Sequence, residues 1–181
     1  MHKPTMKRKQ VLKTLLAGLV VSPVRAAAPA TDFQQEFQKA WKRSRDYTLT
    51  IFNQMPEEHL NFKPTPEMFS FRMQFVHCMI YTTAQLASRL NVKDPYETAQ
   101  GWNQRSKADV AAELGRFYDW VQQTVATQTS AQLSKMQEFV GEELTGPQLF
   151  YALENHIIHH RGQGIVYLRL KGITPEGYFG W

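Results

Sequence analysis

Cysteine is nearly absent from this sequence, because Cys78 is the single one among 181 residues. An internal disulfide is therefore excluded, and stability must come from a packed core, which a bound metal could reinforce. Long apolar runs are also lacking, since the best candidate, residues 11–21, is short and contains Lys13. A run of that length is too short to span a bilayer comfortably. The 43% of apolar residues suffice for the core of about one domain.

The first thirty residues have the organisation of a secretory signal peptide. The cationic stretch "MKRKQ" is followed by the apolar run "VLKTLLAGLVV", and "SPVRAAAPA" ends in small residues that suit a signal peptidase. We therefore predict that residues 1–30 are a signal peptide, cleaved after Ala26, Ala28 or Ala30. Residues 31–181 are then an exported domain, periplasmic or secreted, with no stable membrane insertion after the leader is removed. A retained membrane anchor is the alternative interpretation.

An excess of positive charge is absent from the predicted mature chain. Six of the 21 basic residues and none of the 16 acidic residues lie within residues 1–30, so the remainder has a formal charge of −1. The sequence pI of about 9.4 therefore reflects mainly the leader. Without a basic stripe, the mature chain is not expected to bind nucleic acid, and a small molecule is the expected partner.

Apolar residues at spacings of three and four predict four helices. The first spans about residues 32–54, the second begins at Ser70, the third begins at Ser106, and the fourth runs from about Thr145 to Lys171. Residues 137–144, "QEFVGEEL", are the one stretch where a short extended piece is plausible. Four helices of about twenty residues indicate an all-α four-helix bundle.

The long connection between the second and third helices bears on the topology. Residues 91–105 could reach roughly 50 Å when extended, whereas a helix of about 22 residues is roughly 33 Å long. The connection could therefore return along the bundle and give an up-down-down-up order. A plain antiparallel turn is also compatible with this length.

Half of the six histidines lie within "ENHIIHHRGQ". His156 and His160 are four residues apart, so their imidazoles lie on one face of a helix and can converge, whereas His159 is rotated by about 100°. Zinc proteases use the same spacing, but their intervening glutamate is missing here. A di-iron bundle is disfavoured, because no helix carries a Glu-x-x-His pair. Alternatively, the pair lies on a surface or in the core without a metal.

His77 is the best candidate for a third ligand, because it lies mid-helix among apolar residues and needs a partner there. Three neutral histidines with an open position match a catalytic divalent site, with zinc or nickel as the candidate metals. The alternative is an ordinary hydrogen-bonded core histidine.

Four polar residues lie one or two turns from these histidines: Gln74, Tyr81, Gln163 and Tyr167. We predict that they line a pocket or hold the imidazoles, although ordinary polar positions at a bundle end would look the same. Arg161 is expected to pair with a carboxylate such as Glu154. Gly162 and Gly164 cost helix propensity, which indicates close approach of another helix or of a ligand. No residue can be singled out as a general base.

Two segments carry a family resemblance, "NHIIHHRGQGIVYLRLKGITPEGY" and "LNFKPTPEMFSFRMQFVHCM". The first is similar to the last-helix signature of the DinB/YfiT-like family of metal-dependent enzymes, and the second resembles the approach to the second helix of that family. The resemblance covers about residues 32–179. It implies an up-down-down-up bundle and a divalent metal held by His77, His156 and His160. Thiol-S-transferases and an isomerase belong to the family, as do many members without an assigned reaction.

These observations leave two hypotheses for the function. The first is a metal-dependent hydrolase or a (thiol) transferase that acts on a small molecule outside the cytoplasm. The second is a non-catalytic bundle that is stabilised by a metal or binds a ligand. A homodimer is a further expectation from the resemblance, and the aromatic tail "YFGW" is available for such a contact.

Overall fold

The computed structural model describes residues 33–179, and these residues form four long helices and several short elements. The long helices are α2 (Phe33–Gln54), α3 (Phe71–Leu90), α4 (Lys107–Thr127) and α6 (Gly146–Leu170). The short elements are η1 (Glu57–His59), η2 (Trp102–Gln104), α5 (Ser130–Ser134), β1 (Gln137–Phe139) and β2 (Glu142–Leu144). The four predicted helices are therefore confirmed. The signal peptide predicted for residues 1–30 lies outside the described residues.

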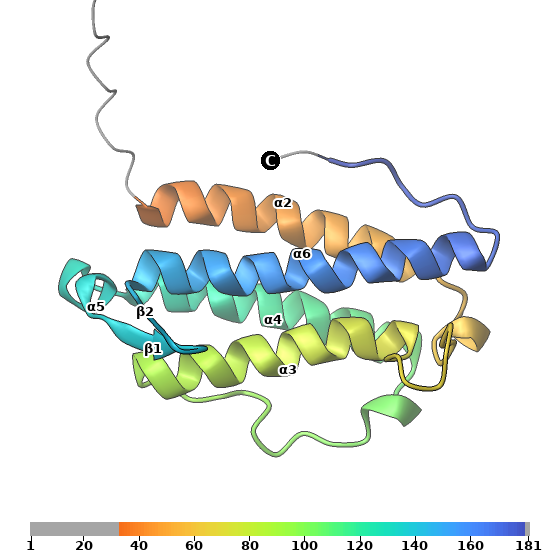
Figure 1. Ribbon diagram of the computed structural model, residues 1–181, viewed down its shortest axis with the longest axis horizontal. Helices are drawn as coiled ribbons and strands as arrows, with labels where there is room; N and C mark the ends of the chain where they lie inside the picture. Colours follow the sequence, from red (N-terminus) through yellow and green to blue (C-terminus); the bar gives the residue numbers. More distant parts are fainter. Residues whose placement is uncertain (1–32, 180–181) are drawn as a thin grey trace, which may run out of the picture. The chain divides into compact units, whose positions relative to one another are not determined.

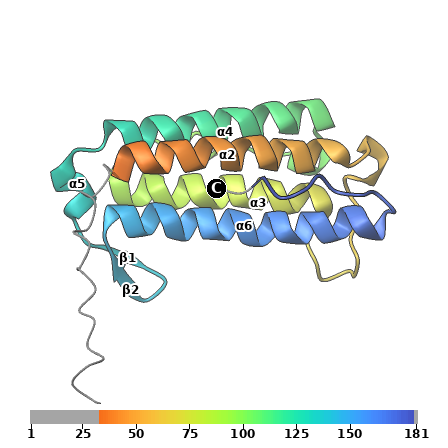
Figure 2. The same cartoon turned by 90° about the horizontal axis from the view of Figure 1, so that it is seen from above.

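The four long helices have the up-down-down-up order. In Figure 1, α2 and α6 run in one direction, whereas α3 and α4 run in the other. Helix α2 packs against α4 and α6, and α3 packs against the same two helices (Figure 2). The parallel pair of α3 and α4 is connected by the long segment after α3, as the sequence allowed. The predicted bundle and its helix order are confirmed.

The ends of the helices are set by local sequence signals. Ser70 and Ser106 each accept a hydrogen bond from the backbone N–H three residues further on, as N-caps do. Thr145 and Gln148 form a reciprocal capping box, in which the backbone N–H of Thr145 donates to Oε1 of Gln148 at 2.8 Å. Gly172 adopts φ +74° directly beyond α6, where a side chain would be strained.

A buried arginine holds the crossover segment in place. Arg72, in the first turn of α3, donates from Nη1 to the backbone carbonyls of Trp102 at 3.0 Å and Arg105 at 2.6 Å. The guanidinium of Arg105 in turn covers the ring of Trp102, with Cζ 3.9 Å from the ring centroid. These contacts place the end of the crossover beside the start of α3, so that α4 begins at the same end of the bundle.

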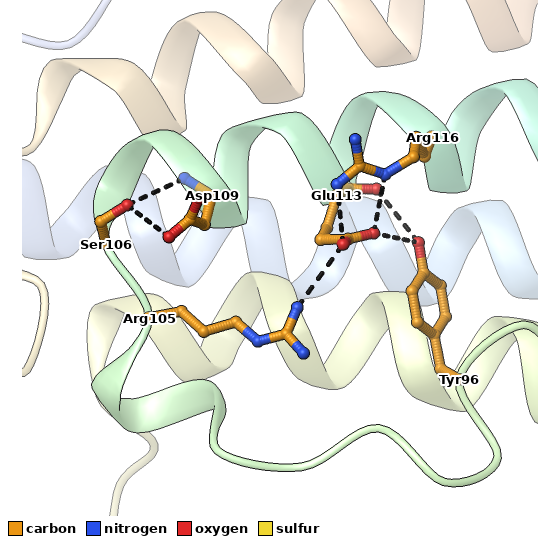
Figure 3. A network of polar contacts seen from close by, with 6 residues as sticks. All are labelled: Tyr96, Arg105, Ser106, Asp109, Glu113 and Arg116. Carbon is orange, nitrogen blue, oxygen red and sulfur yellow. Dashed lines mark hydrogen bonds and ion pairs between the residues drawn. The ribbon is translucent and has the colours of Figure 1, made fainter.

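Glu113 on α4 ties the same segment to the bundle (Figure 3). Its carboxylate accepts hydrogen bonds from Tyr96 at 3.3 Å and from Nε of Arg116 at 3.0 Å, and Arg105 lies 3.5 Å away. These groups partly line an open cavity of about 430 Å³. Two arginines share one carboxylate there, and the network fastens the crossover to α4.

The extended piece expected at residues 137–144 is a β-hairpin. Strands β1 and β2 pair antiparallel, with Gln137 opposite Leu144. Val140 and Gly141 both have positive φ at the tip, which is the requirement of a two-residue hairpin turn. Arg89, at the end of α3, donates to the carbonyl of Glu138 at 2.6 Å and so attaches the hairpin to the bundle.

The centre of the bundle is filled mainly by aromatic and aliphatic side chains. Five almost fully buried aromatic side chains pack against one another between α2, α4 and α6: Phe37, Trp41, Phe117, Tyr118 and Phe150. The indole N–H of Trp41 donates to the carbonyl of Tyr118 at 2.9 Å, so its polar atom is satisfied. None of the described helices combines the length and the apolar character needed to cross a membrane.

Arg161 lies inside the bundle, where it binds α2 rather than the carboxylate that we expected. Its Nη1 donates to the hydroxyls of Ser44 at 3.0 Å and Thr48 at 2.9 Å, and its Cζ lies 4.8 Å from the ring centroid of Tyr47. Within residues 33–179 no ion pair shorter than 4 Å joins it to Glu154. A direct ion pair is therefore not formed, because the guanidinium group binds the hydroxyl groups of α2, but the charge of Arg161 still opposes the rise that burial causes in the pKa of Glu154.

The segment after α6 returns along α2 (Figure 1). The rings of Tyr178 and Phe179 lie 6.1 and 4.8 Å from that of Tyr47, and Arg43 donates to the carbonyl of Phe179. Part of the aromatic tail is thus used within the chain, while Tyr178 stays exposed. The homodimer remains a prediction.

Candidate metal centre

Three imidazoles converge between α3 and α6. His77 lies in the middle of α3, and His156 and His160 lie one turn apart on α6, which packs antiparallel to it. Each histidine offers one nitrogen to a group whose members all lie within 4.8 Å of one another. The Nε2 atoms of His156 and His160 are 3.1 Å apart. The three predicted ligands are therefore brought together by the fold.

The donor set fits a divalent metal ion. A tetrahedral ion with Zn–N bonds of 2.0–2.1 Å holds its nitrogens about 3.3 Å apart, which lies within the spacing of this group. The group contains imidazoles only, so nitrogen-preferring ions such as zinc or nickel suit it better than magnesium or calcium. No acidic residue takes part, and the three side chains are half-buried or buried.

The surroundings favour the neutral imidazoles that a metal requires. Burial, together with the charges of the nearby His156 and His77, lowers the pKa of His160 to about 4. Burial also lowers the pKa of His156 to about 4, helped by His77 and His159. Desolvation lowers the pKa of His77 as well. Three adjacent cations would repel one another, so at neutral pH all three rings are uncharged and each has one nitrogen with a lone pair.

The predicted supporting residues form a hydrogen-bonded layer behind His160. Gln74, which is 1% exposed, has its Oε1 only 2.6 Å from Nδ1 of His160. Its Nε2 donates to Oε1 of Gln163 at 2.9 Å and to the hydroxyl of Tyr167 at 3.0 Å. Tyr167 is also 1% exposed and donates to the carbonyl of Phe69 at 2.9 Å. Gln74 thus holds the ring of His160 in place, and Tyr167 holds Gln74.

His156 has less support than His160. Its Nδ1 is buried and has no hydrogen-bond partner. Tyr81, the fourth predicted residue, lies against it with ring centroids 4.6 Å apart and also reaches within 5.7 Å of the ring of His77. Tyr81 therefore forms an aromatic wall beside two of the three imidazoles.

Phe69 is a residue of the site that the sequence analysis did not single out. It is 43% exposed, and its ring centroid lies 5.0 Å from that of His77 and 6.3 Å from that of His160. Its position directly before the N-cap Ser70 could have indicated this, because an apolar residue there often folds back onto the first turns of the helix.

Two neighbouring residues with potential ligand atoms, His159 and Cys78, are not part of the three-histidine group. His159 is exposed and lies outside the group of three, although its Nε2 accepts a hydrogen bond from Gln163 at 2.8 Å. Cys78 is buried, and burial raises the pKa of its thiol far above the usual range. The thiol therefore remains protonated and is a poor nucleophile.

The two glycines after the histidine pair differ. A Cβ on Gly164 would lie 2.9 Å from Cζ of Phe75, so α3 and α6 approach each other closely at this point. A Cβ on Gly162 would meet nothing within 4 Å. The expectation of close approach is confirmed for Gly164 and wrong for Gly162, which faces outward on the exposed side of α6.

The fold and the site together define an up-down-down-up four-helix bundle with a three-histidine centre between its second and fourth long helices. The chain belongs to the DinB superfamily, whose model matches residues 40–163. This membership confirms the family resemblance drawn from the sequence.

Similar proteins come from several bacteria. The protein YrdA of Bacillus subtilis is 26% identical over 155 residues, which cover 80% of this chain and 86% of YrdA. A DinB-like protein from Bacillus cereus has a TM-score of 0.66 at 20% identity, covering 82% of this chain and 100% of that structure. YfiT from Bacillus subtilis, described as a probable metal-dependent hydrolase with an unusual four-helix bundle topology, has a TM-score of 0.62 at 12% identity, covering 83% and 94%. These structures share the fold.

Proposed function

We propose that the protein is a metal-dependent enzyme, a hydrolase or a transferase that acts on a small molecule. The single observation that carries the proposal is the convergence of three neutral imidazoles on one point between two helices. A surface pair of histidines or a lone core histidine would not produce such a group. The description of YfiT as a probable metal-dependent hydrolase supports the same reaction class.

The ligands in this proposal are His77, His156 and His160, and zinc or nickel is the proposed ion. A divalent ion bound by three imidazoles keeps a coordination position open and acts as a Lewis acid that lowers the pKa of a water or a thiol. Gln74, on α3, orients the imidazole of His160 through the 2.6 Å contact of its Oε1 with Nδ1. Phe69 and Tyr81 flank the imidazoles and offer aromatic faces to an incoming substrate.

Hydrolysis and group transfer differ only in the nucleophile, so the site supports both. The described residues around the three histidines include aromatic and amide side chains, whereas Arg161 is directed to α2. We therefore propose an uncharged small substrate, with water as the nucleophile in a hydrolase or a low-molecular-weight thiol in a transferase.

Metal analysis of matched alanine variants tests the ligand assignment. The purified protein should contain about one divalent ion per chain. His160→Ala should lose this ion, because it removes one of three ligands. His159→Ala should keep most of it, since His159 lies outside the group. Equal losses in the two variants would show that the ligands were assigned to the wrong face of α6.

A cobalt-substituted sample distinguishes an enzyme from a metal-stabilised bundle. In the enzyme, added azide or a small thiol should change the visible spectrum of cobalt, because it can enter the open coordination position. A spectrum that stays unchanged at saturating azide would indicate a closed structural site and would favour the non-catalytic alternative.

A further inference from the structure

We propose that Gln74 is a positioning residue that fixes the tautomer of His160, so that Nε2 of this ring carries a lone pair before any metal arrives. The inference rests on the proposed function, because it takes Nε2 of His160 as the atom that binds the metal. It goes further, because it identifies a chain of hydrogen bonds with one consistent direction that begins at a backbone carbonyl.

The direction is set at the far end of the chain, by Phe69. Its backbone carbonyl can only accept a hydrogen bond, and the hydroxyl of Tyr167 lies 2.9 Å away. The hydroxyl of Tyr167 therefore donates its one hydrogen bond to the carbonyl of Phe69. Its oxygen must then act as the acceptor toward Gln74, whose amide lies 3.0 Å away. The amide group of Gln74 that faces Tyr167 is consequently the NH₂ group.

The contacts of Gln163 are compatible with the same direction. Its Nε2 lies 2.8 Å from a ring nitrogen of His159, and its Oε1 lies 2.9 Å from Nε2 of Gln74. Both amide protons of Gln74 are thus used, one for Gln163 and one for Tyr167. The remaining polar atom, Oε1, can only accept, and it lies 2.6 Å from Nδ1 of His160.

His160 must therefore carry its proton on Nδ1. A neutral imidazole has one proton, so Nε2 keeps its lone pair, and this is the atom that lies 3.1 Å from Nε2 of His156. Gln74 and Tyr167 are each 1% exposed, so water cannot easily replace a broken bond in this chain. Reversing the amide of Gln74 would leave several buried groups facing like partners, which is costly.

No comparable hydrogen bond fixes the tautomer of His156. His156 is therefore the ring that has to change its tautomer when a metal binds. Because Nε2 of His160 is an acceptor, Nε2 of His156 is the donor across the 3.1 Å contact in the metal-free protein. Taking Nε2 as the ligand atom of His156 as well, metal binding requires a lone pair there, so the proton must leave Nε2 and a proton must be taken up at Nδ1. The buried Nδ1 of His156 has no acceptor, so nothing favours this second tautomer in advance.

The tautomers can be observed directly by nitrogen-15 NMR of the histidine rings. We would record the metal-free protein in the presence of chelator at pH 8, well above the lowered pKa values of these rings. The expected result is an Nδ1–H tautomer for His160 and an Nε2–H tautomer for His156. Addition of zinc should convert His156 and leave His160 unchanged.

Substitutions of Gln74 separate its acceptor oxygen from its bulk. Gln74→Met keeps the volume but removes the acceptor, so His160 should become a mixture of tautomers and zinc should bind about 10–100-fold more weakly. Gln74→Glu keeps an acceptor facing Nδ1 and should retain the Nδ1–H tautomer, but its second oxygen cannot donate to Gln163 and Tyr167, so this variant should be less stable than the unmodified protein.

Tyr167→Phe provides a second route should Gln74→Met not fold. It removes one acceptor from the amide of Gln74, and a smaller tautomer shift in the same direction is expected. Tyr151→Phe is the matched control, because Tyr151 packs against Phe33 and Phe37, away from the histidines, and should change neither tautomer nor affinity.

The outcomes distinguish the two proposals. An Nε2–H tautomer for His160 in the metal-free protein would overturn the role of Gln74 even if zinc binds. Full retention of the Nδ1–H tautomer in both Gln74→Met and Tyr167→Phe would overturn it as well. The expected tautomers in a protein that fails to bind any divalent metal would support the hydrogen-bond chain while refuting the proposed function.

Discussion

At the scale of single residues, almost all polar atoms around the site have a hydrogen-bond partner. Oε1 of Gln74 and the hydroxyl of Tyr167 each have partners within 3.0 Å, whereas Nδ1 of His156 has none. Buried polar atoms without a partner are rare in folded proteins and call for an explanation. Here the unpaired nitrogen belongs to the ring that must change its tautomer in order to bind a metal.

The two glycines of α6 provide a matched pair for testing how tightly α3 and α6 pack. Gly164→Ala should destabilise the protein by about 1–3 kcal/mol, because the new Cβ would lie 2.9 Å from the ring of Phe75. That ring cannot easily move, since Phe52 and Phe71 lie 5.3 and 5.0 Å from it. Gly162→Ala meets nothing within 4 Å and should stabilise the protein by up to about 1 kcal/mol through helix propensity. Urea unfolding of both variants measures these changes, and a stabilised Gly164→Ala variant would contradict the packing argument.

At the scale of the elements, the crossover between α3 and α4 determines the helix order. A parallel pair of helices needs a connection that returns along the bundle, and this connection has to be attached. Arg72 attaches it through two backbone carbonyls, and Glu113 attaches it from α4 (Figure 3). With the crossover in place, α4 packs against α2, and α6 lies beside α3 with its histidines facing His77.

The contribution of Glu113 should depend on pH in a defined direction. A hydrogen bond from Arg116 holds the pKa of Glu113 below its usual value, and the positive charges of Arg116 and Arg105 lower it further. A carboxyl group whose pKa is lower in the folded state stabilises that state above its unfolded-state pKa, and this stabilisation is lost as pH falls through its folded-state pKa. Glu113→Gln should therefore lower the free energy of unfolding by about 1 kcal/mol at pH 7, and by less at pH 3–4. The effect is no larger than this because water screens the charge of the exposed Arg116.

Urea unfolding of the protein and of Glu113→Gln between pH 7 and pH 3 checks this dependence. Glu143→Gln is a matched control, since Glu143 lies exposed on β2 and outside the network. A difference between the protein and Glu113→Gln that stays constant over the whole range would show that the carboxylate charge plays no part.

The elements were predictable from the sequence to the extent that their signals are local. Ser70, Ser106 and Thr145 mark helix starts by contacts within three residues, and the pair His156–His160 lies within one helix turn. His77 was predicted as the third ligand because it lies mid-helix among apolar residues, and the family resemblance implied the same, but helix periodicity could not place it beside His156, 79 positions further along the chain. The series of hydrogen bonds from His160 to Phe69 could not be predicted, because these hydrogen bonds join residues up to 98 positions apart.

The hydrogen-bond partners of Arg161 were missed for the same reason. Sequence spacing placed Glu154 and Arg161 on one helix, but it does not show which groups of α2 lie within hydrogen-bond distance of the guanidinium. The hydroxyl groups of Ser44 and Thr48, more than 110 residues away in the chain, decide the partner of Arg161. Contacts between distant segments depend on how the helices pack, and helix periodicity alone does not predict them.

At the scale of the whole molecule, the proposed ligands connect two helices that are far apart in sequence. His77 belongs to α3, and His156 and His160 belong to α6, so an ion bound to all three would crosslink the second and fourth long helices. Unfolding separates these helices and disperses the ligands. A ligand that binds only the folded state stabilises the entire domain by mass action.

Thermal unfolding should therefore respond to zinc. At a free zinc concentration about 100 times the Kd, the folded state gains about 2.7 kcal/mol, which corresponds to a Tm increase of about 5–11 °C for a domain of this size. The increase should be absent in His77→Ala, which leaves the pair on α6 without its partner on α3, and it should persist in His59→Ala, since His59 lies on η1 outside the group. Scanning calorimetry with zinc and then with excess chelator measures both effects. An equal increase in His77→Ala would mean that zinc binds to a different part of the chain.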